Sequence, residues 1–82
     1  MTATLVLVGK PGCHLCEVMR SVVAPVATEM GLGLEEKDVR SDPELARYRH
    51  DIPVLLLEGR EVARHRTTDA HLRATLSQLL AV

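Results

Sequence analysis

The chain has 82 residues, of which 46% are hydrophobic and 26% are charged, so we expect one small globular domain over residues 1–82. A formal net charge of −1 and a single aromatic residue argue against a nucleic-acid binder, which needs a basic surface and aromatic stacking platforms. The apolar runs are too short to span a membrane. The first residues lack the basic and apolar regions of a signal peptide, so we expect a cytoplasmic location.

The first two predicted elements are a buried strand and an amphipathic helix. Residues 4–8 form an apolar, β-rich run that is followed by a predicted turn at residues 9–12. A helix should come next, capped at its C-terminus by Gly31 and kinked at Pro25. Its predicted apolar face has helical spacing and consists of Leu15, Val18, Met19, Val22, Val26 and Met30.

Turn and capping residues indicate two shorter elements in the middle of the chain. Residues 33–39 should form a short strand, because the chain must return to the sheet after the helix. A short helix should follow. It begins either with a capping box between Ser41 and Glu44, or with Asp42 as the cap and Pro43 as the first helical residue.

The last third of the chain is predicted to form a hairpin and a final helix. A buried strand over residues 54–57 turns at residues 58–60, where Gly59 supplies a positive φ, into a strand over residues 61–64. Residues 67–69 should open the last helix. The apolar face of this helix is predicted to hold Leu72, Leu76, Leu79 and Leu80. The element order β-α-β-α-β-β-α predicts an α/β fold.

The most informative feature is the pair Cys13 and Cys16, at the junction between the first strand and the first helix. Cys13 should lie at the helix N-terminus, where free backbone amides and the helix dipole favour an anion. Lys10 and His14 would add positive potential. We therefore expect the pKa of Cys13 to fall from about 8.5 into the range of roughly 3.5–7.5, which makes Cys13 the attacking thiolate and Cys16 the resolving thiol.

Two other interpretations of the cysteine pair stay open. Both cysteines could be small buried hydrophobic residues without a chemical role. They could also bind a metal or an iron–sulfur cluster shared between two chains. The histidines show no metal-binding spacing, and His50, His65 and His71 lie in polar segments, so we predict no metal site within one chain.

Five segments resemble the glutaredoxin-like branch of the thioredoxin-fold superfamily, in their order and spacing. They are residues 5–8 (LVLV), 10–17 (KPGCHLCE), 42–45 (DPEL), 52–55 (IPVL) and 58–61 (EGRE). The most specific part is Cys-x-x-Cys followed about forty residues later by Ile-Pro-Val. The resemblance implies a three-layer thioredoxin-like fold around a central mixed four-stranded sheet.

The same resemblance implies roles for five residues outside the cysteine pair. Pro53 would be cis and pack against the cysteines, and Ile52 would present its backbone to a substrate strand or to glutathione. Lys10 would stabilise the thiolate and meet a glutathione carboxylate. Thr68 and Asp69 would bind the γ-glutamyl end of glutathione, although capping a helix is the more ordinary role of such residues.

The chain departs from the glutaredoxin pattern at two places. Residues 14–15 (His-Leu) replace the usual Pro-Tyr between the cysteines, and residues 62–66 lack the Gly-Gly that lets the backbone of glutathione approach. The Trp-Cys-Gly-Pro-Cys sequence of thioredoxins is absent as well. Glutathione and a reductase therefore both stay open as electron donors.

Taken with the resemblance, these features predict a small cytoplasmic dithiol thiol–disulfide oxidoreductase, with Cys13 as the nucleophile and Cys16 as the resolving thiol. Its partners would be a disulfide in a protein or small molecule and a cellular reductant. The resemblance implies glutathione as a co-substrate, with a reductase as the alternative electron donor, and we expect no bound cofactor and a monomeric protein. The alternatives are a metal or iron–sulfur carrier and a non-catalytic thioredoxin-fold adaptor.

Overall fold

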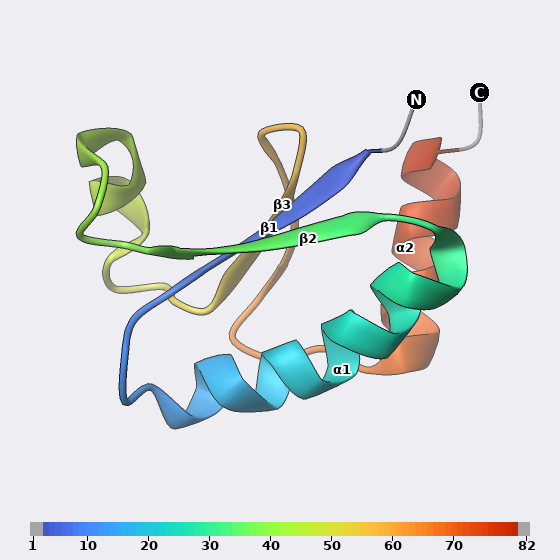
Figure 1. The fold of residues 1–82 in the computed structure, drawn as a ribbon, viewed down its shortest axis with the longest axis horizontal. Coiled ribbons are helices and arrows are strands. Elements are labelled where there is room, and N and C mark those ends of the chain that lie inside the picture. The colour runs from blue at the N-terminus through green and yellow to red at the C-terminus, as the bar shows by residue number, and fades with distance from the viewer. Residues whose placement is uncertain (1–2, 81–82) are drawn as a thin grey trace.

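The computed structural model describes residues 3–80 of the chain (Figure 1). Strands and helices follow one another in the order that the sequence predicts. The elements are β1 (Thr4–Gly9), α1 (His14–Met30), β2 (Gly33–Asp38), the 3₁₀ helix η1 (Pro43–Tyr48), β3 (Val54–Leu57), β4 (Arg60–Arg64) and α2 (Asp69–Leu80).

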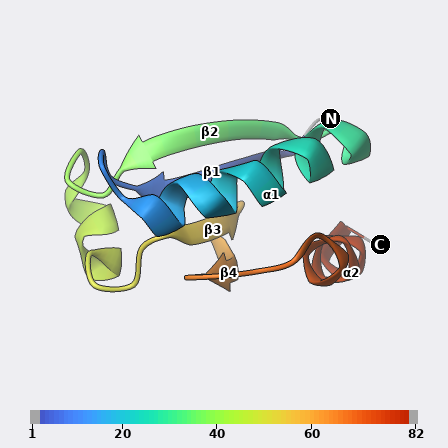
Figure 2. The same ribbon diagram turned by 90° about the horizontal axis from the view of Figure 1, so that it is seen from below.

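The sheet is mixed and four-stranded, as predicted, with β1 and β3 at its centre. The strand order is β2-β1-β3-β4, in which β1 is parallel to β2 and antiparallel to β3. β4 pairs antiparallel with β3. Because a parallel pair needs a crossover, α1 runs back across one face of the sheet before β2 begins (Figure 2). The end of β1 and the start of α1 therefore lie close together.

Side chains alternate along the two central strands and build a core on each face of the sheet. In β1, Leu5 and Leu7 pack with α1 and α2, whereas Val6 and Val8 pack with η1. The layers are thus the two α-helices, the sheet and η1. The first core holds Leu5, Leu7, Met19, Val23, Val26, Ala27, Leu55, Leu57, Val62, Leu72 and Leu76, and the second holds Val8, Val39, Leu45, Tyr48, Val54 and Leu56.

Helix α1 has the predicted ends, but its buried face differs from the predicted one. Gly31 caps the C-terminus with a φ of 70°. Val18 was expected in the core and is 43% exposed, so that prediction is wrong. The helix continues through Pro25, and the kink expected there stays a prediction. The buried residues are Cys16, Met19, Val23, Val26 and Ala27, a stripe with the same helical spacing but rotated around the helix axis.

The second of the two predicted starts for the middle helix is the one observed. Asp42 caps η1, since its Oδ1 accepts a hydrogen bond from the Glu44 N–H at 2.9 Å, and Pro43 is the first helical residue. The Ser41 hydroxyl instead donates to the Asp38 carbonyl at 2.7 Å. The six residues form a 3₁₀ helix, which suits a short connecting segment.

The hairpin and the last helix also follow the prediction, except at one residue. Glu58 and Gly59 have φ values of 50° and 82°, as a two-residue type I′ turn between β3 and β4 requires. Leu72 and Leu76 of α2 are fully buried. Leu80 is 38% exposed, so its prediction as a core residue is wrong. It lies in the last turn of α2.

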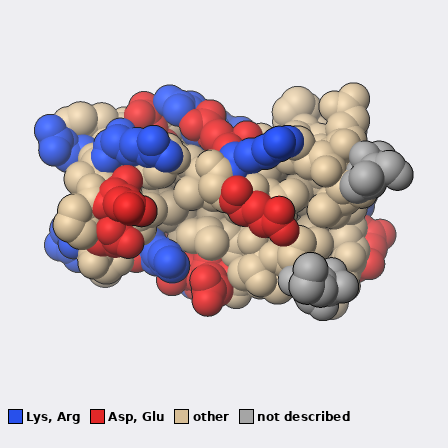
Figure 3. All heavy atoms as spheres, turned by 90° about the horizontal axis from the view of Figure 1, so that it is seen from above, with Lys and Arg blue, Asp and Glu red and all other residues tan. Residues whose placement is uncertain are grey.

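The helices and the surface charges bear on the expectations about membrane spans and nucleic-acid binding. No helix within residues 3–80 has both the length and the apolar character needed to cross a membrane. On the face seen in Figure 3, basic and acidic side chains are interspersed, in keeping with the net charge of −1. That face offers a mixed charge pattern to partners, where a nucleic-acid binder would present a basic surface.

Candidate functional site

Cys13 and Cys16 form a disulfide at the start of α1. Their Cα atoms are 5.2 Å apart. Cys13 is the N-cap residue, and its Sγ accepts a hydrogen bond from the Cys16 N–H at 3.2 Å. Cys13 is half-buried, whereas Cys16, in the first helical turn, is 9% exposed. The sulfur at the helix N-terminus is therefore the one that a partner reaches more easily.

A tight turn delivers the chain from β1 into this helix start. Gly12 adopts a φ of 75°, a conformation that favours glycine. The Cys13 N–H donates to the Lys10 carbonyl at 3.4 Å, and the Glu17 N–H donates to the Cys13 carbonyl at 3.2 Å. Among the amides of the first helical turn, the Cys16 N–H is the one that donates to the Cys13 side chain.

The end of β1 lies directly against the second cysteine. A β-carbon added to Gly9 would be 2.8 Å from the Cys16 Sγ and 3.2 Å from the Cys16 Cβ. At this distance only a residue without a side chain fits between the strand and the helix. The Gly9 carbonyl also accepts a hydrogen bond from the Val39 N–H at 2.7 Å, which ties the end of β1 to the residue after β2.

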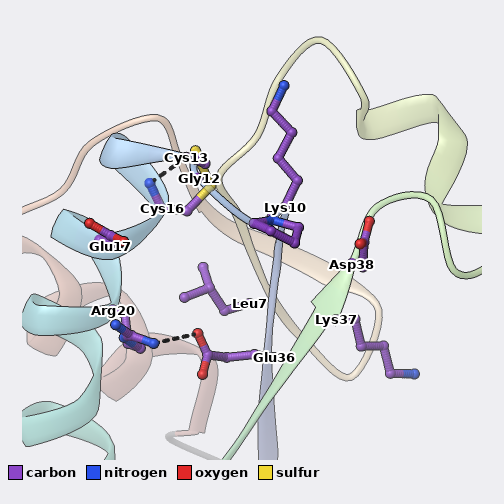
Figure 4. A pocket seen from close by; sticks show the side chains of 12 residues that line it. Leu7, Lys10, Gly12, Cys13, Cys16, Glu17, Arg20, Glu36, Lys37 and Asp38 are labelled. Atoms are coloured by element: carbon purple, nitrogen blue, oxygen red, sulfur yellow. Dashed lines mark hydrogen bonds and ion pairs between the residues drawn. A yellow bond between two sulfur atoms is a disulfide. The ribbon is translucent and has the colours of Figure 1, made fainter.

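A cleft of about 330 Å³ opens beside the disulfide, between the start of α1 and the edge strand β2 (Figure 4). Both cysteines line it, together with the apolar side chain of Leu7. Arg20 of α1 and Glu36 of β2 also line the cleft and form an ion pair at 3.5 Å. The cleft is large enough to receive one or two side chains of a partner.

Lysine and aspartate side chains flank the same cleft. Lys10 lines it, but in Figure 4 its ammonium group points away from the two sulfur atoms. Asp38 is held by Arg40, whose side chain and backbone N–H both donate to its carboxylate. These hydrogen bonds lower the pKa of Asp38 from 3.8 to about 2. The role expected of Lys10 at the thiolate stays a prediction.

The Ile52–Pro53 peptide bond is cis and precedes β3. Val54 pairs with Val8 of β1, so Pro53 comes next along the ladder, beside the end of β1, and the contact expected between Pro53 and the cysteines stays a prediction. Pro53 is buried.

Ile52 is half-buried and packs on the second core. Within residues 3–80, its backbone N–H and C=O make no hydrogen bond with another backbone group. Since backbone polar groups normally find partners, these two are available to an extended chain lying alongside.

Besides Ile52 and Pro53, three more of the predicted site residues do not line the cleft. His14 is exposed at the first position of α1. Thr68 caps α2, because its Oγ1 accepts a hydrogen bond from the His71 N–H at 3.2 Å. Asp69 pairs with Arg73 at 3.0 Å, which lowers the pKa of Asp69. Thr68 and Asp69 line a separate hollow between α1 and α2, so a ligand role for them stays a prediction.

Metal ligands are sparse around the cysteines. Among residues 3–80, no three His, Cys, Asp or Glu side chains are grouped so that they could hold a metal ion. A structural zinc site needs about four ligands. A metal carried by Cys13 and Cys16 would therefore need further ligands from a second molecule.

Sequence reasoning does not single out Gly9, Arg20 or Glu36. The available signal for Gly9 is a glycine that ends a strand just before Cys-x-x-Cys. Arg20 follows Cys16 by one helical turn, which places both on the same side of α1. The pairing of Arg20 with Glu36 depends on the placement of α1 over β2, which no local sequence pattern specifies.

The fold and the disulfide at its strand–helix junction define a thioredoxin-fold protein. Thioredoxin 1 from the thermophilic eubacterium Thermosipho africanus matches with a TM-score of 0.66 and 17% identity, over 94% of this chain and 93% of that chain. Thioredoxin-2 of the malaria parasite matches with a TM-score of 0.68 and 20% identity, over 94% of this chain and 82% of that chain. At these identities the similarity establishes the fold.

The chain belongs to the family described as Glutaredoxin-like domain (DUF836), whose model matches residues 4–77. Protein Ne2328 from Nitrosomonas europaea, solved by solution NMR, is similar with a TM-score of 0.75 and 27% identity, over 90% of this chain and 91% of that chain. No curated protein matches the chain. The glutaredoxin-like resemblance and the thioredoxin-like fold predicted from the sequence are thus confirmed.

Proposed function

We propose that this glutaredoxin-like protein is a small cytoplasmic dithiol thiol–disulfide oxidoreductase. The observation that carries the proposal is the unequal exposure of the two bonded cysteines. Cys13 is half-buried at the N-cap of α1, and Cys16 is 9% exposed in the first turn. A substrate disulfide can approach Cys13, while Cys16 stays within bonding reach of it, and a dithiol mechanism needs this arrangement.

The reaction starts from the reduced protein, in which both cysteines are thiols or thiolates. The Cys13 thiolate attacks one sulfur of a substrate disulfide, forms a mixed disulfide and releases the other substrate sulfur as a thiolate. Cys16 then gives its proton to solvent and attacks the Cys13 Sγ, which releases the second substrate thiolate. The substrate disulfide is reduced by two electrons and the cysteine pair is oxidised to the Cys13–Cys16 disulfide, which a thiol reductant later reduces again.

Electrostatics at the helix start support Cys13 as the attacking group. Its sulfur accepts the Cys16 N–H and stands at the positive end of α1, both of which stabilise a thiolate relative to a thiol. His14 at the first helical position and Lys10 in the preceding turn bring further positive charge to this end of α1 when they are protonated. A cysteine on the surface away from a helix N-terminus would lack these stabilising contacts.

The electron donor is either glutathione or a dithiol reductase. Glutathione is the donor that the family resemblance implies. His65 lies in the stretch where glutathione-using members carry Gly-Gly, and it adopts a φ of 63°. This stretch therefore contains a residue with a positive φ although it lacks the glycines. Both donors, glutathione and a reductase, are compared in the assay below.

A paired assay tests the proposal. One arm supplies glutathione with glutathione reductase, and the other supplies NADPH with thioredoxin reductase; hydroxyethyl disulfide is the substrate in both. We expect turnover in at least one arm, and loss of that turnover in Cys13→Ser. Absence of turnover in both arms, with both thiols titratable, would favour the adaptor, whereas iron or zinc bound to the purified protein would favour the carrier.

A further inference from the structure

The segment that leads to the cis peptide bond is held from the side by the end of β4. Asp51 precedes Ile52, and its Oδ1 lies 3.2 Å from the Arg64 Nη1 and 3.9 Å from the His65 Nε2. Arg64 also binds Glu61 through its guanidinium group. Asp51 and Arg64 are neighbours only because β4 folds back along β3.

A backbone hydrogen bond also connects the end of β4 to the segment around the cis peptide bond. The His65 N–H donates to the Pro53 carbonyl at 2.8 Å. His65 reaches this position with a φ of 63°, which is uncommon for a residue other than glycine and persists only where the surroundings hold it. Residues 51, 53, 64 and 65 thus form one connected unit, which we call the Asp51 clamp.

A bulge aims the end of β4 toward this segment. Leu55 pairs with Ala63 and Leu56 pairs with Glu61, so Val62 is an extra residue in β4. Such bulges turn the strand and re-aim the residues that follow. Here they are Arg64 and His65, the two residues whose side chains lie near Asp51.

We propose that Asp51 is a positioning residue, which through Arg64 and His65 fixes the Ile52 backbone where it receives an extended peptide carrying the substrate disulfide. The proposal rests on the proposed function and names its substrate class: disulfides within peptides or proteins. The free backbone groups of Ile52 would pair with such a chain, whereas a small disulfide has no backbone to pair.

The experiment compares Asp51→Asn with Glu61→Gln, because each removes one carboxylate that pairs with Arg64, and only Asp51 is itself part of the clamp. Arg64→Gln is a second clamp variant. Each protein reduces two substrates, a disulfide-linked pair of peptides and hydroxyethyl disulfide. In parallel, NMR follows hydrogen exchange of the His65 amide, which reports directly on its bond to Pro53.

We expect Asp51→Asn and Arg64→Gln to raise KM for the peptide about two- to fivefold, the range for loss of an exposed ion pair, with kcat nearly unchanged. Hydroxyethyl disulfide reduction should keep its rate, and the His65 amide should exchange faster in both variants than in Glu61→Gln. Equal losses on both substrates, or His65 exchange no faster than in Glu61→Gln, would overturn the proposal.

Failure of the clamp and failure of the proposed function are distinguishable. If the wild-type protein reduced neither substrate, the oxidoreductase itself would be refuted and the positioning role would fall with it. If the wild-type protein reduced both substrates and the Asp51→Asn variant behaved like Glu61→Gln, only the positioning role would be refuted.

Discussion

Gly9 and Cys16 are in such close contact that a β-carbon on the glycine would lie 2.8 Å from the cysteine sulfur. The strand end and the helix start are therefore interlocked at this point. The position of the Cys16 sulfur therefore depends on the absence of a side chain at Gly9, a residue of β1 that lies outside the Cys-x-x-Cys sequence.

Gly9→Ala should destabilise the protein by about 1–3 kcal/mol, the usual cost of adding a methylene-sized group to a packed site. Chemical denaturation of the oxidised proteins measures this difference. Gly33→Ala is the matched control, since the nearest atom to its β-carbon would be the Thr4 hydroxyl at 3.0 Å, at the end of a side chain that can rotate. A Gly9→Ala protein as stable as Gly33→Ala would show that the contact with Cys16 relaxes without cost.

Cys13 should titrate below the ordinary cysteine value in the reduced protein. The Cys16 N–H and the helix N-terminus stabilise the Cys13 thiolate, so we expect the pKa of Cys13 to be lowered. The rate of alkylation against pH, measured on Cys16→Ser, gives this value. A midpoint near 8.5, the ordinary value for cysteine, would remove the electrostatic argument for Cys13 as nucleophile.

Asp38 should make stability fall in acid. Its pKa is lowered from 3.8 to about 2, chiefly by the Arg40 side chain, so the folded state binds this proton less readily than the unfolded chain. The contribution is therefore complete above about pH 4 and is lost as the pH falls toward 2.

Arg40→Gln removes the guanidinium but keeps the backbone N–H that donates to Asp38 at 2.8 Å. The pKa of Asp38 should then rise part of the way toward its ordinary value, and Tm should depend less on pH between about pH 5 and 2. NMR titration of the Asp38 carboxyl carbon measures the shift. An unchanged titration in the variant would place the cause elsewhere.

Two valines of α1 test which face of the helix is buried. Val23 is fully buried, so Val23→Ala should cost about 2 kcal/mol for the lost methyl groups and the cavity left behind. Val18 is 43% exposed, so Val18→Ala should stay within about 0.5 kcal/mol of the wild type. Urea denaturation of both variants compares the two; equal losses would mean that Val18 is covered in solution.

The same two valines show where prediction from the sequence stops. Capping and turn residues act through local backbone chemistry, so Gly31, Asp42 and Gly59 are predictable without knowing the rest of the fold. Val18 and Val23 both fit a helical apolar stripe, and only the docking of α1 on the sheet decides which one is covered. Leu80 fits the α2 stripe equally well and is nevertheless 38% exposed.

The candidate site divides in the same way. The Cys-x-x-Cys spacing predicts two sulfurs within bonding reach, and the family resemblance adds the cis bond at Pro53. The ion pairs of Arg20 with Glu36 and of Arg64 with Asp51 join residues that lie 16 and 13 positions apart, and tertiary packing brings them together. In the sequence alone, nothing distinguishes these four side chains from other charged surface residues.

Trapping a mixed disulfide tests the central claim most directly. Cys16→Ser, incubated with a disulfide-linked peptide pair and examined by intact mass without reductant, should gain the mass of one peptide at Cys13 and keep it. Cys13→Ser should gain none under the same conditions. Adduct formation by Cys13→Ser alone, or full dithiol turnover by Cys16→Ser, would contradict the assignment of nucleophile and resolving thiol.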